Sequence, residues 1–245
     1  MLFNYQIIFS YDGSEFYGMQ KQLKQRTVQG VLEAILTRLN GNEAISLKYA
    51  SRTDKGVHAL KQVGSFETNH ELNLYYVLHA LNLALPNDVF VKDIKRVANN
   101  FHPRYLAIKK HYRYLINLNE YDPLLRNQMW FINKELALDK MKECLPLLIG
   151  RHDFRTFSSV SNKKNSIREI YDIIIVKNKG IISIDFYGDG FLRYMIRKLV
   201  MILIEIGLNK KNKEDLVNLL NKKDISAYSQ VAISSGLYLM EVYYD

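Results

Sequence analysis

The stretch Tyr5-Gln6-Ile7-Ile8-Phe9-Ser10-Tyr11 alternates large apolar side chains with mostly polar ones. Successive side chains of a β-strand point to opposite faces, so this pattern predicts a strand with one apolar face. Asp12-Gly13 follows directly, and this pair is typical of a turn. The first predicted element is therefore a β-strand that ends in a turn.

Helices and further strands follow this strand in an irregular order. Thr27 can cap a helix whose apolar side chains recur at helical spacing as far as Leu39, and Gly41 ends it. A second helix is predicted at residues 74–85, where Pro86 stops it. Strands are predicted at residues 45–50, 63–66 and 88–97.

A junction at residues 99–104 is followed by a second set of elements with the same plan. Strands are predicted at residues 105–118, 166–176, 181–187 and 236–243. Helices are predicted at residues 139–149, 191–206 and 214–220, with Gly150 as the stop of the first. Strands and helices do not alternate regularly, which favours an α+β fold over a doubly wound one. We therefore expect two domains, residues 1–104 and 105–245.

Composition narrows the class of partner. The chain has 245 residues, 48% of them hydrophobic, which suits one large or two modest domains with a sizeable core. Its net charge of +9 favours polyanionic partners, nucleic acid first, although a basic surface without a partner fits the same number. The single cysteine, Cys144, cannot form an internal disulfide, and it lies in a predicted helix as a buried thiol.

The same features bear on location. One cysteine in the whole chain fits a reducing cytoplasm. The first residues lack the basic and apolar regions of a signal peptide. The most apolar helix, residues 191–206, contains Arg193, Arg197, Lys198 and Glu205, so we do not expect it to span a membrane.

The first segment with possible chemistry is Arg52-Thr53-Asp54-Lys55-Gly56-Val57-His58. A carboxylate between two cations keeps its charge, because nearby positive charge favours the ionised form. Gly56 permits a tight turn that presents Asp54 at a loop tip, where it could act as a nucleophile. Taken alone, the segment is typical of an ordinary surface turn in which the carboxylate pairs with lysine.

The second segment is Lys109-Lys110-His111-Tyr112-Arg113-Tyr114. In a strand, Tyr112 and Tyr114 point to one face and His111 and Arg113 to the other. Rings interleaved with cations suit RNA, because bases stack on rings and phosphates pair with cations. A strand with two core tyrosines and a solvated basic face is the structural alternative.

The third segment is the start of the helix at residues 191–206. Arg193 and Arg197 are four residues apart and share one helix face. An arginine brought near the core by this helix requires a carboxylate partner, whereas arginines that extend to water require none. Asp185 and Asp189 could pair as acid and base, but a hairpin at that place explains them equally well.

Other chemistries lack support. The six histidines show no metal-ligand spacing, and Thr53, Ser158 and Ser159 have no recognisable catalytic-triad context. No P-loop, dinucleotide-binding fingerprint or zinc-protease motif is present.

Taken together, the chain resembles the TruA family of tRNA pseudouridine synthases nearly from end to end. The matching motifs include Tyr11-Asp12-Gly13-Ser14, Thr27-Val28-Gln29, Ser51 to His58, Phe101-His102-Pro103-Arg104-Tyr105, Tyr112-Arg113-Tyr114, Gly150-Arg151-His152-Asp153-Phe154, Met195-Ile196-Arg197 and Gly236-Leu237-Tyr238-Leu239. The order of these motifs, rather than any one of them, carries the resemblance.

The resemblance implies residue roles. Asp54 matches the catalytic aspartate, Tyr112 the tyrosine that stacks near the target and acts in proton transfer, and Arg197 the basic partner of the aspartate. Arg52 matches an arginine that helps to hold the target base outside the helix, and Leu237 matches an apolar residue of the pocket. The matching motifs also make Lys55, His58 and Arg104 candidates for substrate binding.

The resemblance further implies a homodimer without cofactor or metal. Each subunit is expected to have two related α+β halves, each a mainly antiparallel sheet with helices on one face, that form a basic cleft. Its substrates are expected to be uridines in the anticodon stem-loop of tRNA. Where the family usually has an aromatic residue, this chain has Met19, which can alter either loop packing or RNA contacts.

Two alternatives stay open. A relative that modifies ribosomal RNA would need the same residues. A non-catalytic RNA-binding module would use the basic cleft alone, although such a module gains nothing from a carboxylate that faces phosphates. Whether the loop at residues 158–165, with its basic stretch Ser161-Asn162-Lys163-Lys164-Asn165, closes over RNA is also open.

Overall fold

The computed structural model describes residues 2–159 and 166–245, so the basic stretch at 161–165 lies outside the described residues. The chain divides into two compact units. Unit 1 comprises Met1–Ile108 together with Tyr238–Asp245, and unit 2 comprises Lys109–Leu237. The last strand thus belongs to the same unit as the first strand. The expected division after residue 104 instead assigns the last strand to the second domain.

Unit 1 is built on the strand that opens the chain. β1 (Phe3–Tyr11) pairs antiparallel with β3 (His58–Thr68) on one side and with β4 (Val89–Val97) on the other. β3 also pairs antiparallel with the short β2 (Lys48–Tyr49) and parallel with β10 (Leu237–Tyr243), through the partners Tyr238 and His58. β3 is longer than the predicted strand at 63–66 and starts directly after the Asp54 segment.

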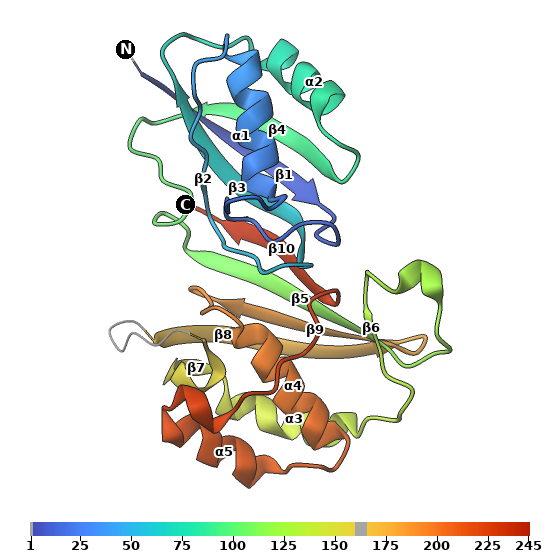
Figure 1. Ribbon diagram of the computed structural model, residues 1–245. Helices are drawn as coiled ribbons and strands as arrows, with labels where there is room; N and C mark the ends of the chain where they lie inside the picture. Colours follow the sequence, from blue (N-terminus) through green and yellow to red (C-terminus); the bar gives the residue numbers. More distant parts are fainter. Residues whose placement is uncertain (1, 160–165) are drawn as a thin grey trace. The chain divides into compact units, whose positions relative to one another are not determined.

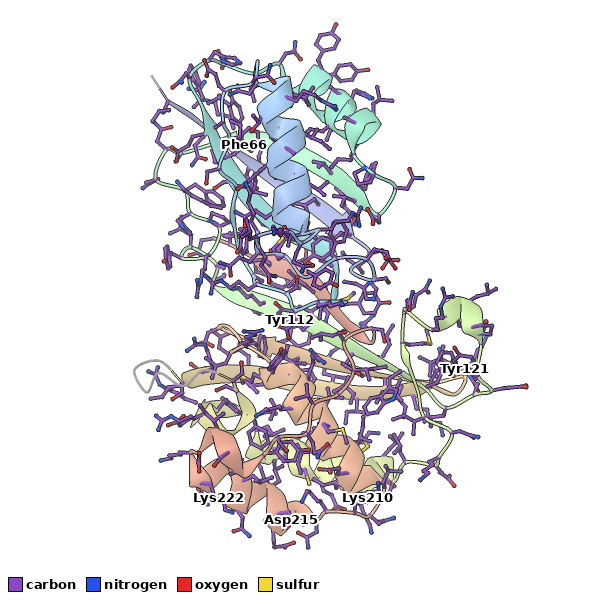
Figure 2. The ribbon with its side chains drawn as sticks, viewed as in Figure 1. Phe66, Tyr112, Tyr121, Lys210, Asp215 and Lys222 are labelled. Atoms are coloured by element: carbon purple, nitrogen blue, oxygen red, sulfur yellow. The ribbon has the colours of Figure 1, made fainter. Side chains whose placement is uncertain are left out.

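Two helices cover one face of this sheet, as Figure 1 shows for this unit. α1 (Val28–Leu39) begins after Thr27, whose hydroxyl accepts a hydrogen bond from the Gly30 backbone, which confirms the predicted cap. α2 (Leu74–Ala84) contacts both α1 and β4. The apolar face of β1 is buried, and the rings of Tyr5 and Phe66 lie 5.8 Å apart in this core (Figure 2).

Unit 2 is also built on an antiparallel sheet, part of which is a meander. Its strands are β5 (Lys109–Asn117), β9 (Ile181–Gly188), β8 (Ile167–Asn178) and β7 (Gly150–Asp153), and they pair antiparallel in that order. The two-residue β6 (Trp130–Phe131) pairs parallel with β5. Lys179 and Gly180 both have positive φ, as a tight turn between β8 and β9 requires.

The helices of unit 2 are α3 (Leu138–Cys144), α4 (Met195–Gly207) and α5 (Lys213–Lys222), on one side of its sheet in Figure 1. Short 3-10 turns lie at Pro123–Leu125 (η1), Leu145–Leu147 (η2), Arg155–Phe157 (η3) and Ile225–Ala227 (η5). Most side chains of α4 are buried, and Ile182, Ile184 and Phe186 of β9 are fully buried.

Two predicted helices differ from the observed ones. The helix expected at residues 139–149 ends at Cys144, because Pro146 lacks a backbone donor and its ring disfavours continuation of an α-helix. The helix expected from residue 191 starts only at Met195, because Tyr194 has a left-handed backbone. The α+β class, with a mainly antiparallel sheet and helices in each unit, is confirmed.

No helix among the described residues is both long enough and apolar enough to be a membrane span.

Candidate active site

Asp54 lies in an irregular loop, residues 50–57, between β2 and β3. The side chains of this loop alternate between the interior and the surface. Ser51 and Thr53 are buried, Arg52 and Lys55 are exposed, and Asp54 is half-buried. The loop therefore fixes itself in unit 1 through two small hydroxyl residues and presents its charged side chains outward.

Gln62 fixes the start of this loop. Its side-chain amide is completely buried, donates to the carbonyl of Ser51 at 2.8 Å and accepts from the backbone N–H of Ser51 at 3.2 Å. The Gln62 side chain thus forms the two backbone hydrogen bonds with Ser51 that a neighbouring strand would otherwise form. Because Gln62 itself lies in β3, the position of Ser51 is tied to the sheet.

Thr53, the residue before Asp54, is fixed by two partners. Its hydroxyl lies 2.8 Å from the hydroxyl of Tyr11, at the end of β1. Its carbonyl accepts a hydrogen bond from the backbone N–H of Met19 at 3.2 Å. The side chain of Met19 is fully buried in unit 1.

Residues 12–19 lie against the Asp54 loop so closely that two positions require glycine. A Cβ on Gly18 would lie 2.6 Å from the carbonyl oxygen of Thr53, and Gly18 has φ of 97°. A Cβ on Gly13 would lie 2.0 Å from the carbonyl oxygen of Val57. The motif around Tyr11-Asp12-Gly13 and the Asp54 motif, forty residues apart in sequence, therefore form one packed structure.

His58 supports this structure from inside. Its ring is buried, stacks on Tyr238 at 4.6 Å and accepts a hydrogen bond from the backbone N–H of Gly13 through Nδ1 at 3.1 Å. The same nitrogen lies 3.1 Å from a carboxylate oxygen of Asp12. Burial raises the pKa of Asp12, but the hydrogen bonds donated by Ser14 lower it overall. A role of His58 in substrate binding would therefore be indirect.

The other candidate cations of unit 1 are exposed. The ammonium group of Lys55 lies 4.0 Å above the ring of Tyr17. Burial raises the pKa of Tyr49, and the positive charges of Arg52 and Arg104 partly offset this effect. Arg52, Asp54, Lys55 and Arg104 all belong to unit 1.

Tyr112 lies in β5 of unit 2 (Figure 2). It is 6% exposed, and its ring contacts that of Phe191 edge-on at 5.4 Å. Tyr114, on the same face, donates from its hydroxyl to the carbonyl of Ile233 at 2.8 Å. The predicted orientation of the two tyrosines is therefore confirmed.

The opposite face of β5 is ion-paired rather than simply solvated. His111 Nε2 and Arg113 Nε lie 2.6 and 2.8 Å from the same oxygen of Asp185, which is buried. Burial raises the pKa of Asp185, but the hydrogen bonds from His111 and Arg113 lower it overall. Asp185 and Asp189 do not pair with each other, since Asp189 accepts from the backbone N–H of Glu169.

Arg197 lies in the first turn of α4 and is half-buried. Its Nε donates to the carbonyl of Ala232 at 2.7 Å, and its guanidinium carbon lies 5.2 Å from the ring centroid of Tyr194. Arg193 is exposed, and its guanidinium lies 5.0 Å from the same ring. Tyr194 thus stands between two arginines, in a left-handed conformation with φ of 65°.

Lys198, which the sequence patterns did not single out, is the most unusual side chain of α4. It is 4% exposed, and its ammonium donates to the carbonyls of Thr156, Ser158 and Tyr228 at 3.2, 3.0 and 2.6 Å. Burial lowers its pKa. Three donors meet three acceptors, so this lysine ties two loops to the helix that carries Arg197.

Leu237, the expected pocket residue, starts β10 and is buried. The residue before it has no room for a side chain, because a Cβ on Gly236 would lie 2.7 Å from the carbonyl oxygen of Leu115. Tyr112, Arg197 and Leu237 lie in unit 2. The convergence of Asp54 with Tyr112 and Arg197 remains a prediction.

Among the described residues, no group of three or more histidine, cysteine, aspartate or glutamate side chains is placed to hold a metal ion.

Comparison with known proteins matches both halves of the chain. A family model described as tRNA pseudouridine synthase matches residues 7–106 and 145–245. A protein named tRNA pseudouridine synthase A from Thermoanaerobacter sp. (strain X514) is 39% identical over 243 residues, which cover 98% of this chain and 99% of that protein. One named tRNA pseudouridine synthase A 2 from Bacillus cereus is 38% identical over 242 residues, 98% of each chain.

A third relative, tRNA pseudouridine synthase A from Acetivibrio thermocellus, is 37% identical over 243 residues, 98% of this chain and 99% of its own. The matched residues include the Asp54 loop, its supports at residues 11–19 and the start of α4, which together define an RNA-modifying enzyme of the isomerase class. The chain belongs to the tRNA pseudouridine synthase family, as its motifs predicted.

Proposed function

We propose that this enzyme converts uridine to pseudouridine in the anticodon stem-loop of tRNA, with Asp54 as the nucleophile. The observation that carries the proposal is the fixation of the Asp54 loop. Gln62, Tyr11 and the backbone of Met19 fix Ser51 and Thr53, while Asp54 itself stays half-buried at the surface of unit 1. A reactive carboxylate needs such a fixed position, because misplacement by about 1 Å can cost about a hundredfold in rate.

The reaction requires no redox change and no external group. The glycosidic bond from the sugar carbon to N1 breaks, the uracil turns, and C5 bonds to the same sugar carbon. An ionised Asp54 could attack the sugar or the base, or assist departure of the uracil. The proton on C5 must then leave, and Tyr112 is the proposed acceptor, directly or through water.

Arg197 is proposed to keep Asp54 ionised. A guanidinium near a carboxylate favours the charged form, and this matters most where water is excluded. Arg197 is suited to the task, because Ala232 and Tyr194 restrict its side chain on two sides. Leu237 is proposed to line the apolar part of the pocket, in which the charge of Asp54 would otherwise be costly.

The proposed substrate is tRNA, as the names of the relatives state for those proteins. The net charge of +9 suits a phosphate-rich partner. A uridine inside a stem must be flipped out at a cost of about a few kcal/mol, and stacking on Tyr112 would offset part of it. Lys55 and Arg104 are proposed phosphate contacts. We further propose a homodimer that acts in the cytoplasm, in keeping with the family resemblance and the single, buried Cys144.

The test compares Asp54→Ala with Asp93→Ala, an exposed aspartate on β4. We expect Asp54→Ala to abolish pseudouridine formation in a tRNA transcript while tRNA binding is largely retained, and Asp93→Ala to behave as wild type. Retained activity in Asp54→Ala would exclude the nucleophile. Pseudouridine mapping in cells with and without the gene addresses the substrate, since loss confined to ribosomal RNA would exclude tRNA. A wild-type protein that binds tRNA without forming pseudouridine would support the binding-module alternative.

A further inference from the structure

An irregular segment of unit 2 lies beside α4. Residues 228–233 follow η5 and form neither a helix nor a strand. Figure 1 shows this segment running along α4. We name residues 228–233 the strap. Because the strap has no helix or strand of its own, its backbone polar groups need partners from other elements.

Arg197 bonds to the strap through both its backbone and its side chain. The carbonyl of Arg197 accepts a hydrogen bond from the backbone N–H of Ala232 at 3.1 Å, and Arg197 Nε donates to the carbonyl of Ala232 at 2.7 Å. A guanidinium group is planar, so a hydrogen bond at Nε fixes the plane in which its other N–H groups lie. The position of Ala232 therefore decides where the guanidinium of Arg197 points.

Buried hydrogen bonds fix both ends of the strap. The ammonium of Lys198, which is 4% exposed, donates to the carbonyl of Tyr228 at 2.6 Å. The hydroxyl of Tyr228 in turn donates to a carboxylate oxygen of Glu205 at 2.7 Å. At the other end, the hydroxyl of Tyr114 donates to the carbonyl of Ile233 at 2.8 Å. The strap is thus fixed to α4 at its start and to β5 at its end.

Lys198 also bonds to a second irregular segment. Its ammonium donates to the carbonyls of Thr156 and Ser158 at 3.2 and 3.0 Å. An ammonium has one N–H for each of the three carbonyls, whereas a neutral amine has too few donors. A buried ammonium is costly unless its donors are paired, so α4, the strap and residues 156–158 must keep their positions relative to one another.

We propose that Lys198 is a positioning residue for the isomerisation. Lys198 fixes the strap, the strap fixes the carbonyl of Ala232, and that carbonyl orients the guanidinium of Arg197. The inference rests on the proposed function, because it takes Arg197 as the partner of Asp54. Lys198 acts on the reaction only through Arg197.

The first experiment measures how fast the Arg197 Nε–H exchanges with water, by nuclear magnetic resonance of the full chain without RNA. Arg197→Ala identifies the signal, because it removes it. Lys198→Met keeps an unbranched side chain but has no donor, Lys198→Arg keeps the charge, and Tyr114→Phe loses only a hydroxyl. Ile206→Ala is the matched control, because this buried residue lies near the end of α4 and its truncation destabilises the fold through lost packing.

We expect Lys198→Met and Tyr114→Phe to speed this exchange by about two- to tenfold, because each removes a hydrogen bond that fixes the strap. Lys198→Arg should lie between Lys198→Met and wild type, and Ile206→Ala should exchange as wild type despite its lower stability in urea. Wild-type exchange in both Lys198→Met and Tyr114→Phe would overturn the inference, as would equally fast exchange in Ile206→Ala. If Lys198→Met does not fold, Tyr114→Phe decides, because it keeps the buried ring.

The second experiment measures single-turnover pseudouridine formation in a tRNA transcript, together with tRNA affinity, where urea unfolding shows each variant to be folded. We expect Lys198→Met to lower the rate about ten- to a hundredfold, as a misplaced catalytic group does, with tRNA affinity within about twofold of wild type. Ile206→Ala should keep the wild-type rate.

The two measurements separate the inference from the function on which it rests. A wild-type rate in Lys198→Met, while Arg197→Ala is inactive, would overturn the inference. A wild-type rate in Arg197→Ala would instead contradict the proposed role of Arg197 in catalysis, and the exchange of its Nε–H would still show whether Lys198 fixes the strap.

Discussion

Replacement of Tyr194 should separate the stability of this enzyme from its activity. Tyr194 has φ of 65°, and its ring lies against Arg193 and Arg197. A left-handed backbone costs an L-residue about 1–2 kcal/mol, whereas glycine adopts it freely. Glycine loses about 0.5–1 kcal/mol in backbone entropy relative to alanine. The difference leaves Tyr194→Gly more stable than Tyr194→Ala by up to about 1.5 kcal/mol, the reverse of the usual order in a helix.

The activity, in contrast, should depend on whether residue 194 carries an aromatic ring. A guanidinium over an aromatic face is worth about 0.5–2 kcal/mol. If that energy positions Arg197, both Tyr194→Gly and Tyr194→Ala should lower kcat/KM by roughly two- to thirtyfold, while Tyr194→Phe stays near wild type. Urea unfolding gives the stability, and release of label from C5 of uridine in a tRNA transcript gives the rate.

Two different experimental results would each contradict one of these expectations. Equal stability of Tyr194→Gly and Tyr194→Ala would show that the left-handed backbone stores no strain. Rates that rise and fall with stability across all three variants would show that the ring acts only through folding. Arg193→Ala serves as the control, since it removes the other cation from the ring and should leave the contact of Arg197 intact.

Three further predictions concern buried polar groups. Gln62→Leu leaves the N–H and carbonyl of Ser51 unpaired and should cost about 2–6 kcal/mol in urea unfolding; a loss under about 1 kcal/mol would mean that water replaces the amide. Lys198→Met leaves three carbonyls without their hydrogen-bond donor and should lower the free energy of unfolding by about 3 kcal/mol or more in the same assay. Lys198→Arg should lower it less, and equal losses in the two variants would show that the ammonium hydrogen bonds do not stabilise the fold. Asp185 has a lowered pKa, so its stabilisation is present above about pH 4 and fades as pH falls further; the stability gap to Asp185→Asn should narrow from pH 5 to pH 3, and a constant gap would contradict the ion pair with His111.

The sequence patterns predicted most elements, because alternation and helical spacing report which faces are buried. They succeeded for β1 and α1, where apolar side chains recur regularly. They failed at Pro146, whose effect inside an apolar helix was overlooked, and at Tyr194, whose left-handed backbone has no signature in a tyrosine. β7 was missed because its four residues are too few to show a period.

The candidate site was predicted as single residues, and the structure adds what supports them. The motifs name Asp54, but only the structure shows that the Gln62 side chain forms two hydrogen bonds with the backbone of Ser51. Lys198 was read as a charge that interrupts an apolar helix, because composition cannot reveal three carbonyls contributed by distant loops. The pairing of Asp185 with His111 and Arg113 likewise depends on strand order, which one sequence does not contain.

The pairing of β10 with β3 has a consequence for synthesis on the ribosome. Tyr238 pairs with His58, and these two residues are 180 positions apart. The ring of Tyr238 covers His58, which in turn supports Gly13 beneath the Asp54 loop. Until the nascent chain includes Tyr238, unit 1 lacks strand β10, and His58 lacks the aromatic ring that stacks on it. The loop that carries Asp54 therefore gains its full support only after Tyr238 has been synthesised and has left the exit tunnel.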